Sequence, residues 1–206
     1  MNIYANSTSF IAFEGSRRIA SGNLQDVALK AKEILDRDVN ASVLIFDEVT
    51  SRPIEVDFRG TAEDVLGKLP PTTSVDASPD GPIEPVPAVP QAPGRPRLGV
   101  VAREVTLLPR HWEWLNDQPS GASAALRKLV EAARHQNAAK DAQRHAQESA
   151  YRFMYTMAGD EPGFEEAMRV FFRGDSKPFK ELTQSWSADV RDHARKLAAE
   201  AFQPLP

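Results

Sequence analysis

Apolar positions in the first 69 residues alternate between strand-like and helix-like spacing. The short apolar run at 9–13 is followed by the turn Glu14-Gly15-Ser16, which is typical of a hairpin whose second strand lies at 17–21. Behind Asn23, a residue type favoured as N-cap, apolar residues recur at helical spacing from Leu24 to Arg37. A continuous apolar run at 42–46 and a strictly alternating run at 54–58 predict two further strands. Residues 61–69 begin like a short helix. The predicted order is β-β-α-β-β-α in a small α+β domain.

After residue 99 the apolar spacing is mainly helical. One short strand is predicted at 103–108, directly before Pro109. No glycine or proline interrupts the chain from Ser123 to Ala158, so this stretch is either one long helix or two helices that meet in the polar region 135–144. Further helices are predicted at 110–118, 164–172 and 187–202. The fold class is therefore α+β, with a mainly helical C-terminal half that contains one short strand.

Aromatic residues are concentrated in this second half. Phe164, Met168, Phe171 and Phe172 follow an i, i+4, i+7, i+8 spacing, which places them on one side of a helix. Aromatic side chains can stack on single-stranded bases, but at helical spacing they are more typical of a core. We expect a core role for this cluster.

Proline divides the chain. Nine of the 16 prolines fall between Pro70 and Pro96, a stretch without helical or strand periodicity. Such a composition is typical of an extended, partly stiff linker. We predict an α+β domain at 1–69, a linker at 70–98 and a mainly helical domain at 99–206.

The charge is distributed unevenly. The chain of 206 residues has a net charge of −4, which excludes a globally basic nucleic-acid-binding protein. Residues 95–144 nevertheless carry nine basic and five acidic side chains, whereas residues 1–69 carry eight basic and eleven acidic ones. This asymmetry is typical either of a local basic binding region or of ordinary solvated helices.

The sequence has no cysteine, no apolar run long enough to cross a membrane and no visible signal peptide, so we expect a cytoplasmic protein with no membrane partner.

Motifs for catalysis are missing. The sequence contains no glycine-rich phosphate loop, no His-Glu-x-x-His and no complete nucleophile elbow. Asp189 and His193 are four residues apart on a predicted helix, but two ligands do not close a metal site, and a solvated acid–base pair is the simpler interpretation. We expect neither enzymatic activity nor a cofactor or metal.

Residues 103–134 resemble a ribbon-helix-helix unit. The likeness is carried by a short strand that ends in Leu108-Pro109, a helix around His111–Leu115, a turn at Gly121-Ala122-Ser123 and a second helix with Arg127-Lys128. In that family two chains pair their strands into a ribbon that enters the DNA major groove, and the second helix begins at a phosphate. The resemblance implies a homodimer formed through 103–108. It implies base-reading positions at Leu107, Val105 and Arg103, and phosphate contacts near Gly121, Ser123, Arg127 and Lys128.

A second DNA-binding signal precedes this unit. Gly94-Arg95-Pro96-Arg97 resembles the core of an AT-hook, which lies in the A·T minor groove. The narrow minor groove has a negative potential that attracts arginine. The resemblance implies that Arg95 and Arg97 contact DNA.

Most of the chain is similar to a family of uncharacterised bacterial proteins, through the segments 44–60, 94–115 and 151–164. An acidic α+β domain before a ribbon-helix-helix unit also resembles some antitoxins, which bind a toxin and their own operator. We therefore expect a dimeric, DNA-binding transcriptional regulator with DNA as its partner. The alternative is a protein-interaction adaptor or an antitoxin-like protein that binds a protein partner.

Overall fold

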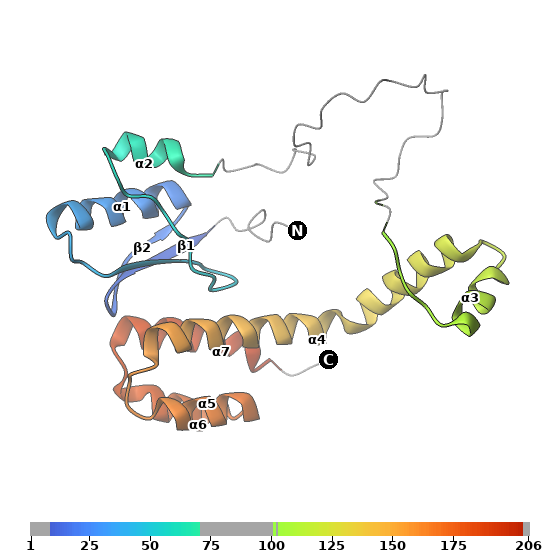
Figure 1. Ribbon diagram of the computed structural model, residues 1–206. Coiled ribbons are helices and arrows are strands. Elements are labelled where there is room, and N and C mark those ends of the chain that lie inside the picture. Colours follow the sequence, from blue (N-terminus) through green and yellow to red (C-terminus); the bar gives the residue numbers. More distant parts are fainter. Residues whose placement is uncertain (1–8, 71–100, 102, 204–206) are drawn as a thin grey trace, which may run out of the picture. The chain divides into compact units, whose positions relative to one another are not determined.

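The computed structural model describes residues 9–70, 101 and 103–203 (Figure 1). The chain forms two compact units, one made of residues 1–73 and 138–206 and the other of residues 74–137. The linker predicted at 70–98 lies, apart from Pro70, outside the described residues, so the predicted domain division stays a prediction.

The first unit contains a three-stranded antiparallel sheet with the strand order β2-β1-β3. Strands β1 (Phe10–Glu14) and β2 (Arg17–Gly22) form the predicted hairpin. Gly15 at the turn has a φ of 55°, a left-handed conformation that glycine adopts without a steric penalty. Strand β3 (Val43–Asp47) pairs with the other edge of β1.

Two helices accompany this sheet and both begin where the sequence predicts. Helix α1 (Leu24–Arg37) is capped by Asn23, whose Oδ1 accepts a hydrogen bond from the Asp26 N–H at 2.9 Å. Helix α2 (Ala62–Lys68) begins with a capping box. Thr61 Oγ1 accepts from the Asp64 N–H at 3.2 Å, and the Asp64 carboxylate accepts from the Thr61 N–H at 2.8 Å.

The predicted fourth strand at 54–58 is wrong. The chain makes one isolated bridge between Phe46 and Pro53, and the Ile54 N–H donates to the Ile45 carbonyl at 2.8 Å. Among the described residues the ladder does not continue past Ile54. The side chains of Ile54, Val56 and Phe58 still pack against the apolar cluster beside α1. The alternating pattern thus reported correctly which side chains are covered, but it carried no information about backbone pairing.

The remaining elements are helices. Helix α4 is a single helix of 37 residues, which decides between the two interpretations of this stretch. A short helix and a 3-10 turn at 176–185 are not among the elements predicted from the sequence. Pro178 occupies the first turn of its helix, where proline is tolerated. The bounds are α3 Pro109–Asn116, α4 Ala122–Ala158, α5 Phe164–Arg173, α6 Ser176–Leu182, η2 Thr183–Ser185 and α7 Ala188–Ala201.

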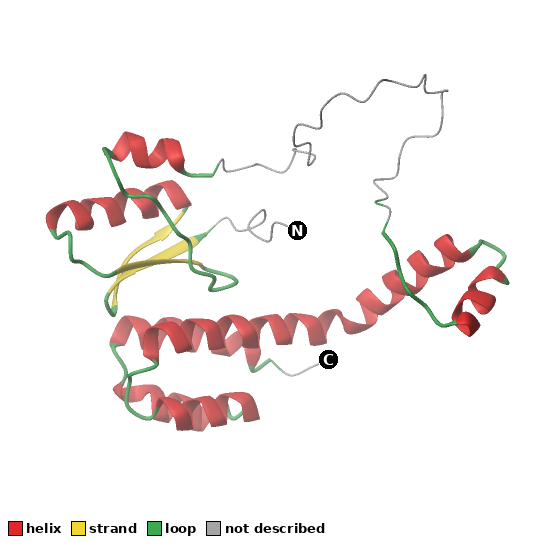
Figure 2. Cartoon of the chain, viewed as in Figure 1, coloured by secondary structure: helices red, strands yellow, loops and turns green. Residues whose placement is uncertain are grey.

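The sheet of the first unit is covered on both faces (Figure 2). Phe10 and Ala12 of β1 face the cluster that contains α1, whereas Ile11 and Phe13 face a second cluster built from α4, α5 and α7. The ring centroid of Phe153 on α4 lies 5.5 Å from that of Phe13 and 5.7 Å from that of Phe46. The continuous apolar run in β1 is explained by this double burial, since a strand covered on both faces has no polar side.

Candidate nucleic-acid interface

Helix α3 and the start of α4 form the helical hairpin of the second unit. Pro109 is the first residue of α3, where its missing N–H is not needed. Gly121 has a φ of 72°, and its carbonyl accepts from the Ala125 N–H at 3.0 Å, so α4 begins directly after this glycine. The helix–turn–helix order predicted from Pro109 and Gly121 is present.

The strand predicted at 103–108 is not present. These residues belong to no strand, and no backbone hydrogen bond joins 103–107 to another described residue. A strand is stabilised by the backbone of a neighbouring strand, and the described part of this chain offers none here. The segment is solvent-exposed apart from Leu107, which is half-buried. The sequence pattern indicated the residue preference of a strand, but it could not supply the partner.

The hairpin leaves much of its apolar surface uncovered. Only Leu115 on α3 and Ala125 on α4 are buried among its apolar residues. Seven of the exposed large apolar residues in the described chain belong to this unit: Val101, Val105, Leu108, Trp112, Trp114, Leu129 and Val130. Helix α3, the start of α4 and the extended residues before Pro109 therefore leave these apolar side chains uncovered.

The basic residues predicted to contact phosphate lie at the start of α4. Arg127 and Lys128 are exposed, and neither forms an ion pair with any residue that the structure describes. Gly121 and Ser123, which flank the first helical residue, are also exposed. No acidic side chain lies in the first turn of α4. The N–H groups and positive dipole end of this helix are therefore accessible to an anion.

The other predicted DNA contacts are divided. Arg103 is exposed on the extended segment, about six residues before α3. Arg95 and Arg97 lie outside the described residues. Further along α4, Arg134 pairs with Glu131 at 3.0 Å and Arg144 pairs with Asp141 at 3.0 Å, which reduces the local positive potential beyond residue 130.

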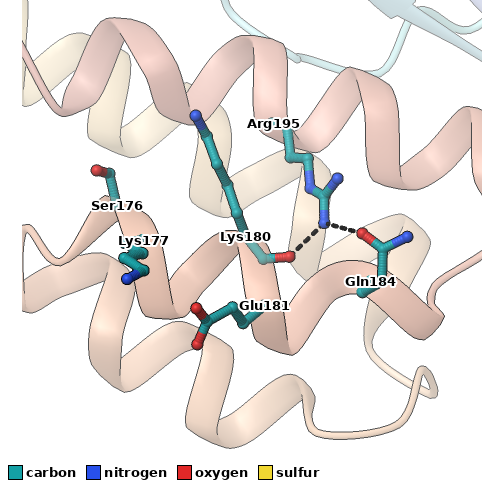
Figure 3. Close-up of a pocket in the computed structure, with 6 residues that line it drawn as sticks. All are labelled: Ser176, Lys177, Lys180, Glu181, Gln184 and Arg195. Atoms are coloured by element: carbon teal, nitrogen blue, oxygen red, sulfur yellow. Dashed lines mark hydrogen bonds between the residues drawn. The ribbon is translucent and has the colours of Figure 1, made fainter.

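A separate surface pocket of about 560 Å³ lies between α6 and α7 (Figure 3). It contains the basic side chains Lys177, Lys180 and Arg195. Arg195 Nε donates to Thr183 Oγ1 at 2.9 Å, and its guanidinium also donates to the Lys180 carbonyl and to Gln184 Oε1. Burial lowers the pKa of Arg195 from its ordinary value. Because these donors already bind protein atoms, we interpret Arg195 as a structural link between η2 and α7.

The sequence interpretation of Asp189 and His193 as a solvated pair is wrong. His193 is buried between α7 and the sheet, where its ring contacts Phe13 and Phe153. Asp189 instead accepts a hydrogen bond from the Arg18 N–H at 2.8 Å. A signal for this burial existed in the sequence, because His193 is three residues after Val190 and four before Leu197, on the apolar side of α7.

A buried polar cluster fixes the loop after β3 to α4, and sequence reasoning missed it. Ser149 Oγ donates to the Val49 carbonyl at 2.7 Å and lies 2.9 Å from Ser51 Oγ. Arg152 donates to the Thr50 carbonyl. Asp47 Oδ1 accepts from the N–H groups of Val49 and Thr50 at 3.0 and 2.7 Å. The contacts of Ser149 and Arg152 join positions about 100 residues apart, so no local pattern could predict them.

The described residues contain no group of three His, Cys, Asp or Glu side chains arranged to hold a metal ion. Within residues 9–70 and 103–203, none of the helices combines the length and apolar character that crossing a membrane requires.

These features define an α+β protein with a helix-covered sheet and a separate helical hairpin. A family model described as "Uncharacterized protein conserved in bacteria (DUF2239)" matches residues 9–198. The chain therefore belongs to this bacterial family, as its sequence segments predicted. Comparisons with curated proteins and with solved structures gave no match. The ribbon-helix-helix resemblance is not confirmed.

Proposed function

We propose that the protein is a DNA-binding regulator that acts as a homodimer through residues 103–134. The observation that carries this proposal is the combination of an extended segment without a backbone partner and a helical hairpin with an uncovered apolar side. Association of two copies would provide both the missing backbone partner and a cover for the apolar side chains. Paired 103–108 segments would satisfy each other's backbone groups, and paired hairpins would bury Leu108, Leu129 and Val130.

The start of α4 supports contact with a phosphate. A helix N-terminus offers free N–H groups and a positive dipole end, which together favour an anion. Arg127 and Lys128 lie in the second turn of this helix and add two positive charges without an acidic neighbour in the first turn. In the proposal these two side chains hold the DNA backbone and set the orientation of the protein.

Base recognition is assigned to the paired 103–108 segments. A two-stranded ribbon fits the major groove of B-DNA. Arg103 and Val105 are exposed at alternate positions of the segment and are available for such contacts. Val105 can read a thymine methyl group by apolar contact, whereas Arg103 can donate to guanine. Arg95 and Arg97 are proposed to add a preference for A·T-rich flanks. With this role, the proposed location of the protein is the cytoplasm.

Fluorescence anisotropy with mixed-sequence duplex DNA at two salt concentrations tests this function. Binding that depends on phosphate contacts weakens steeply as salt rises. We expect binding at low salt and a marked loss at high salt. The absence of binding at low salt would contradict the proposal.

A protein-interaction adaptor is the second candidate, and one observation favours it. Trp112 and Trp114 are 38% and 52% exposed, and tryptophan is enriched at the centres of protein interfaces. A pull-down from bacterial lysate with and without nuclease separates the two functions. A partner that survives nuclease treatment supports the adaptor, whereas loss of captured material after nuclease treatment supports DNA binding.

A further inference from the structure

Three exposed aromatic rings form a continuous patch on the first unit. Tyr151, Tyr155 and Phe172 are 40%, 65% and 55% exposed. The centroid of Tyr151 lies 5.8 Å from that of Tyr155 and 5.6 Å from that of Phe172. The rings come from α4 and α5 (Figure 1). The sequence predicted Phe172 in the core, and this is wrong, since Phe171 and not Phe172 is buried.

A hollow of about 570 Å³ adjoins this patch and carries negative charge. Tyr155 lines it together with Asp160, Glu161 and Glu165, and none of its lining residues is basic. Asp160 and Glu165 are exposed and form no ion pair with a described residue. Helix α4 also ends here, at Ala158, so its negative dipole end adds to the potential. The surface therefore combines adjoining aromatic rings with an attraction for cations.

The proline-rich part of the sequence has the complementary chemistry. Pro87, Pro90, Pro93 and Pro96 recur at every third position, and Arg95 and Arg97 flank the last of them. A polyproline II helix has about three residues per turn, so a peptide of this sequence in that conformation presents the four prolines on one face. Grooves lined with aromatic side chains bind such peptides.

We propose that the patch of Tyr151, Tyr155 and Phe172 binds residues 87–97 of a second copy of this chain. The proline face lies on the three rings, and Arg95 or Arg97 reaches the carboxylates of Asp160 and Glu165. The acidic lining disfavours single-stranded nucleic acid, the other ligand that stacks on exposed aromatic rings, because phosphates are repelled there. This self-association does not depend on the DNA-binding role of the hairpin.

Binding of a fluorescent peptide with the sequence of residues 85–99 tests the ligand. The full chain is used with Pro87, Pro90, Pro93 and Pro96 replaced by Ala, so that its own segment does not compete. We expect saturable binding that weakens about tenfold in Tyr155→Ala, because Tyr155 is the most exposed of the three rings and belongs to both the patch and the hollow, and a few aromatic contacts carry most of the energy of such an interface. The Asp160→Lys/Glu165→Lys double variant should also weaken binding, and Trp114→Ala, an exposed aromatic of the hairpin, should leave it unchanged. Equal binding by Tyr155→Ala, or displacement of the peptide by a thymidine oligonucleotide, would contradict the proposal.

Disulfide cross-linking tests whether a second copy supplies the segment. The chain has no cysteine of its own, so introduced thiols report single contacts. Thr156→Cys lines the hollow and Ala92→Cys lies in the segment. When the two single variants are mixed under oxidising conditions, we expect a mixed dimer. Replacing Thr156→Cys with Val39→Cys, at an exposed site elsewhere in the same unit, should give none.

The doubly substituted chain Ala92→Cys/Thr156→Cys provides the decisive control. If it closes a disulfide within one chain at high dilution, and the mixed single variants form no dimer, the segment binds its own chain and the proposal is wrong. Cross-linking in a chain that does not bind DNA would still support this inference, so its outcome is independent of the proposed function.

Discussion

The imidazole of His193 lies edge-on against the ring of Phe153, with ring centroids 4.5 Å apart and an interplanar angle of 72°. Phe13 of β1 also contacts it, at a centroid distance of 6.0 Å. His193 therefore connects α7 to both α4 and the sheet. It does so in a position that is only 5% exposed, which penalises the charged form of the ring.

We expect the stability of the protein to depend on pH through His193. The pKa of His193 is lowered from 6.5 to about 4. Burial is the largest cause, Lys196 and Arg18 act in the same direction, and Glu48 opposes them. Between these two pKa values the unfolded chain binds more protons than the folded chain. The free energy of unfolding should therefore fall as pH decreases from 6.5 to 4, by roughly 3 kcal/mol at most. Urea unfolding at several pH values measures this slope.

The matched variant is His193→Leu, which has no titrating group and fits an apolar site. Its free energy of unfolding should change much less across the same pH range. Hydrogen bonds from Lys196 and Ser9 lower the pKa of Glu48. Protonation of Glu48 therefore reduces the free energy of unfolding of both proteins at still lower pH. If the variant and the parent have the same slope between pH 6.5 and 4, the assignment to His193 is wrong.

Ser149→Ala should destabilise the first unit. The hydroxyl of Ser149 is buried, and its removal leaves the Val49 carbonyl and the Ser51 hydroxyl without this partner. A buried polar group without a partner costs about 1–3 kcal/mol. Chemical denaturation measures the change, and Ser123→Ala, at an exposed position of the same helix, is the control. A Ser149→Ala variant as stable as the parent would show that the loop contact is unimportant.

Local features of the fold could be predicted from the sequence, because their causes are local. Asn23 and Thr61 cap their helices through side-chain oxygens that reach only three residues along the chain. Pro109 and Gly121 mark where α3 and α4 begin, again through the backbone conformation of single residues. The predictions of a fourth strand at 54–58 and of a strand at 103–108 were wrong, because a strand depends on a partner strand that residue spacing does not identify.

Long-range packing could not be predicted in the same way. The apolar run of β1 predicted a strand, but no sequence feature indicated that α4 and α7 cover its second face. The candidate interface was only partly predictable. Arg127 and Lys128 were proposed from their place after a turn, and both are exposed; their contact with DNA stays a prediction. The exposure of Trp112, Leu129 and Val130 depends on what covers the hairpin.

If the hairpin mediates self-association, a negative charge introduced on its apolar side should weaken the dimer. Leu129 and Val130 are 49% and 57% exposed on α4. Replacing either with Glu should weaken the dimer, because a charge would have to be buried in the paired interface. The stability of the first unit should change by less than about 0.5 kcal/mol, since both residues are exposed. Sedimentation velocity measures the dimer fraction.

The control for these variants is Val39→Glu. Val39 is 85% exposed in the first unit, and its replacement should not alter the dimer fraction. A parent protein that is monomeric at tens of micromolar would exclude the dimer. An unchanged dimer in Leu129→Glu and Val130→Glu would show that association occurs elsewhere.

Salt-dependent DNA binding by the Arg127→Glu/Lys128→Glu double variant tests the central claim most directly. Both residues are exposed, so the variant should remain folded, as circular dichroism would show. We predict weaker binding to every DNA sequence and a shallower dependence of affinity on salt, because each lost phosphate contact reduces that slope by about one. A folded double variant that binds DNA with the affinity and salt dependence of the parent would contradict the assignment of the α4 N-terminus as the phosphate site.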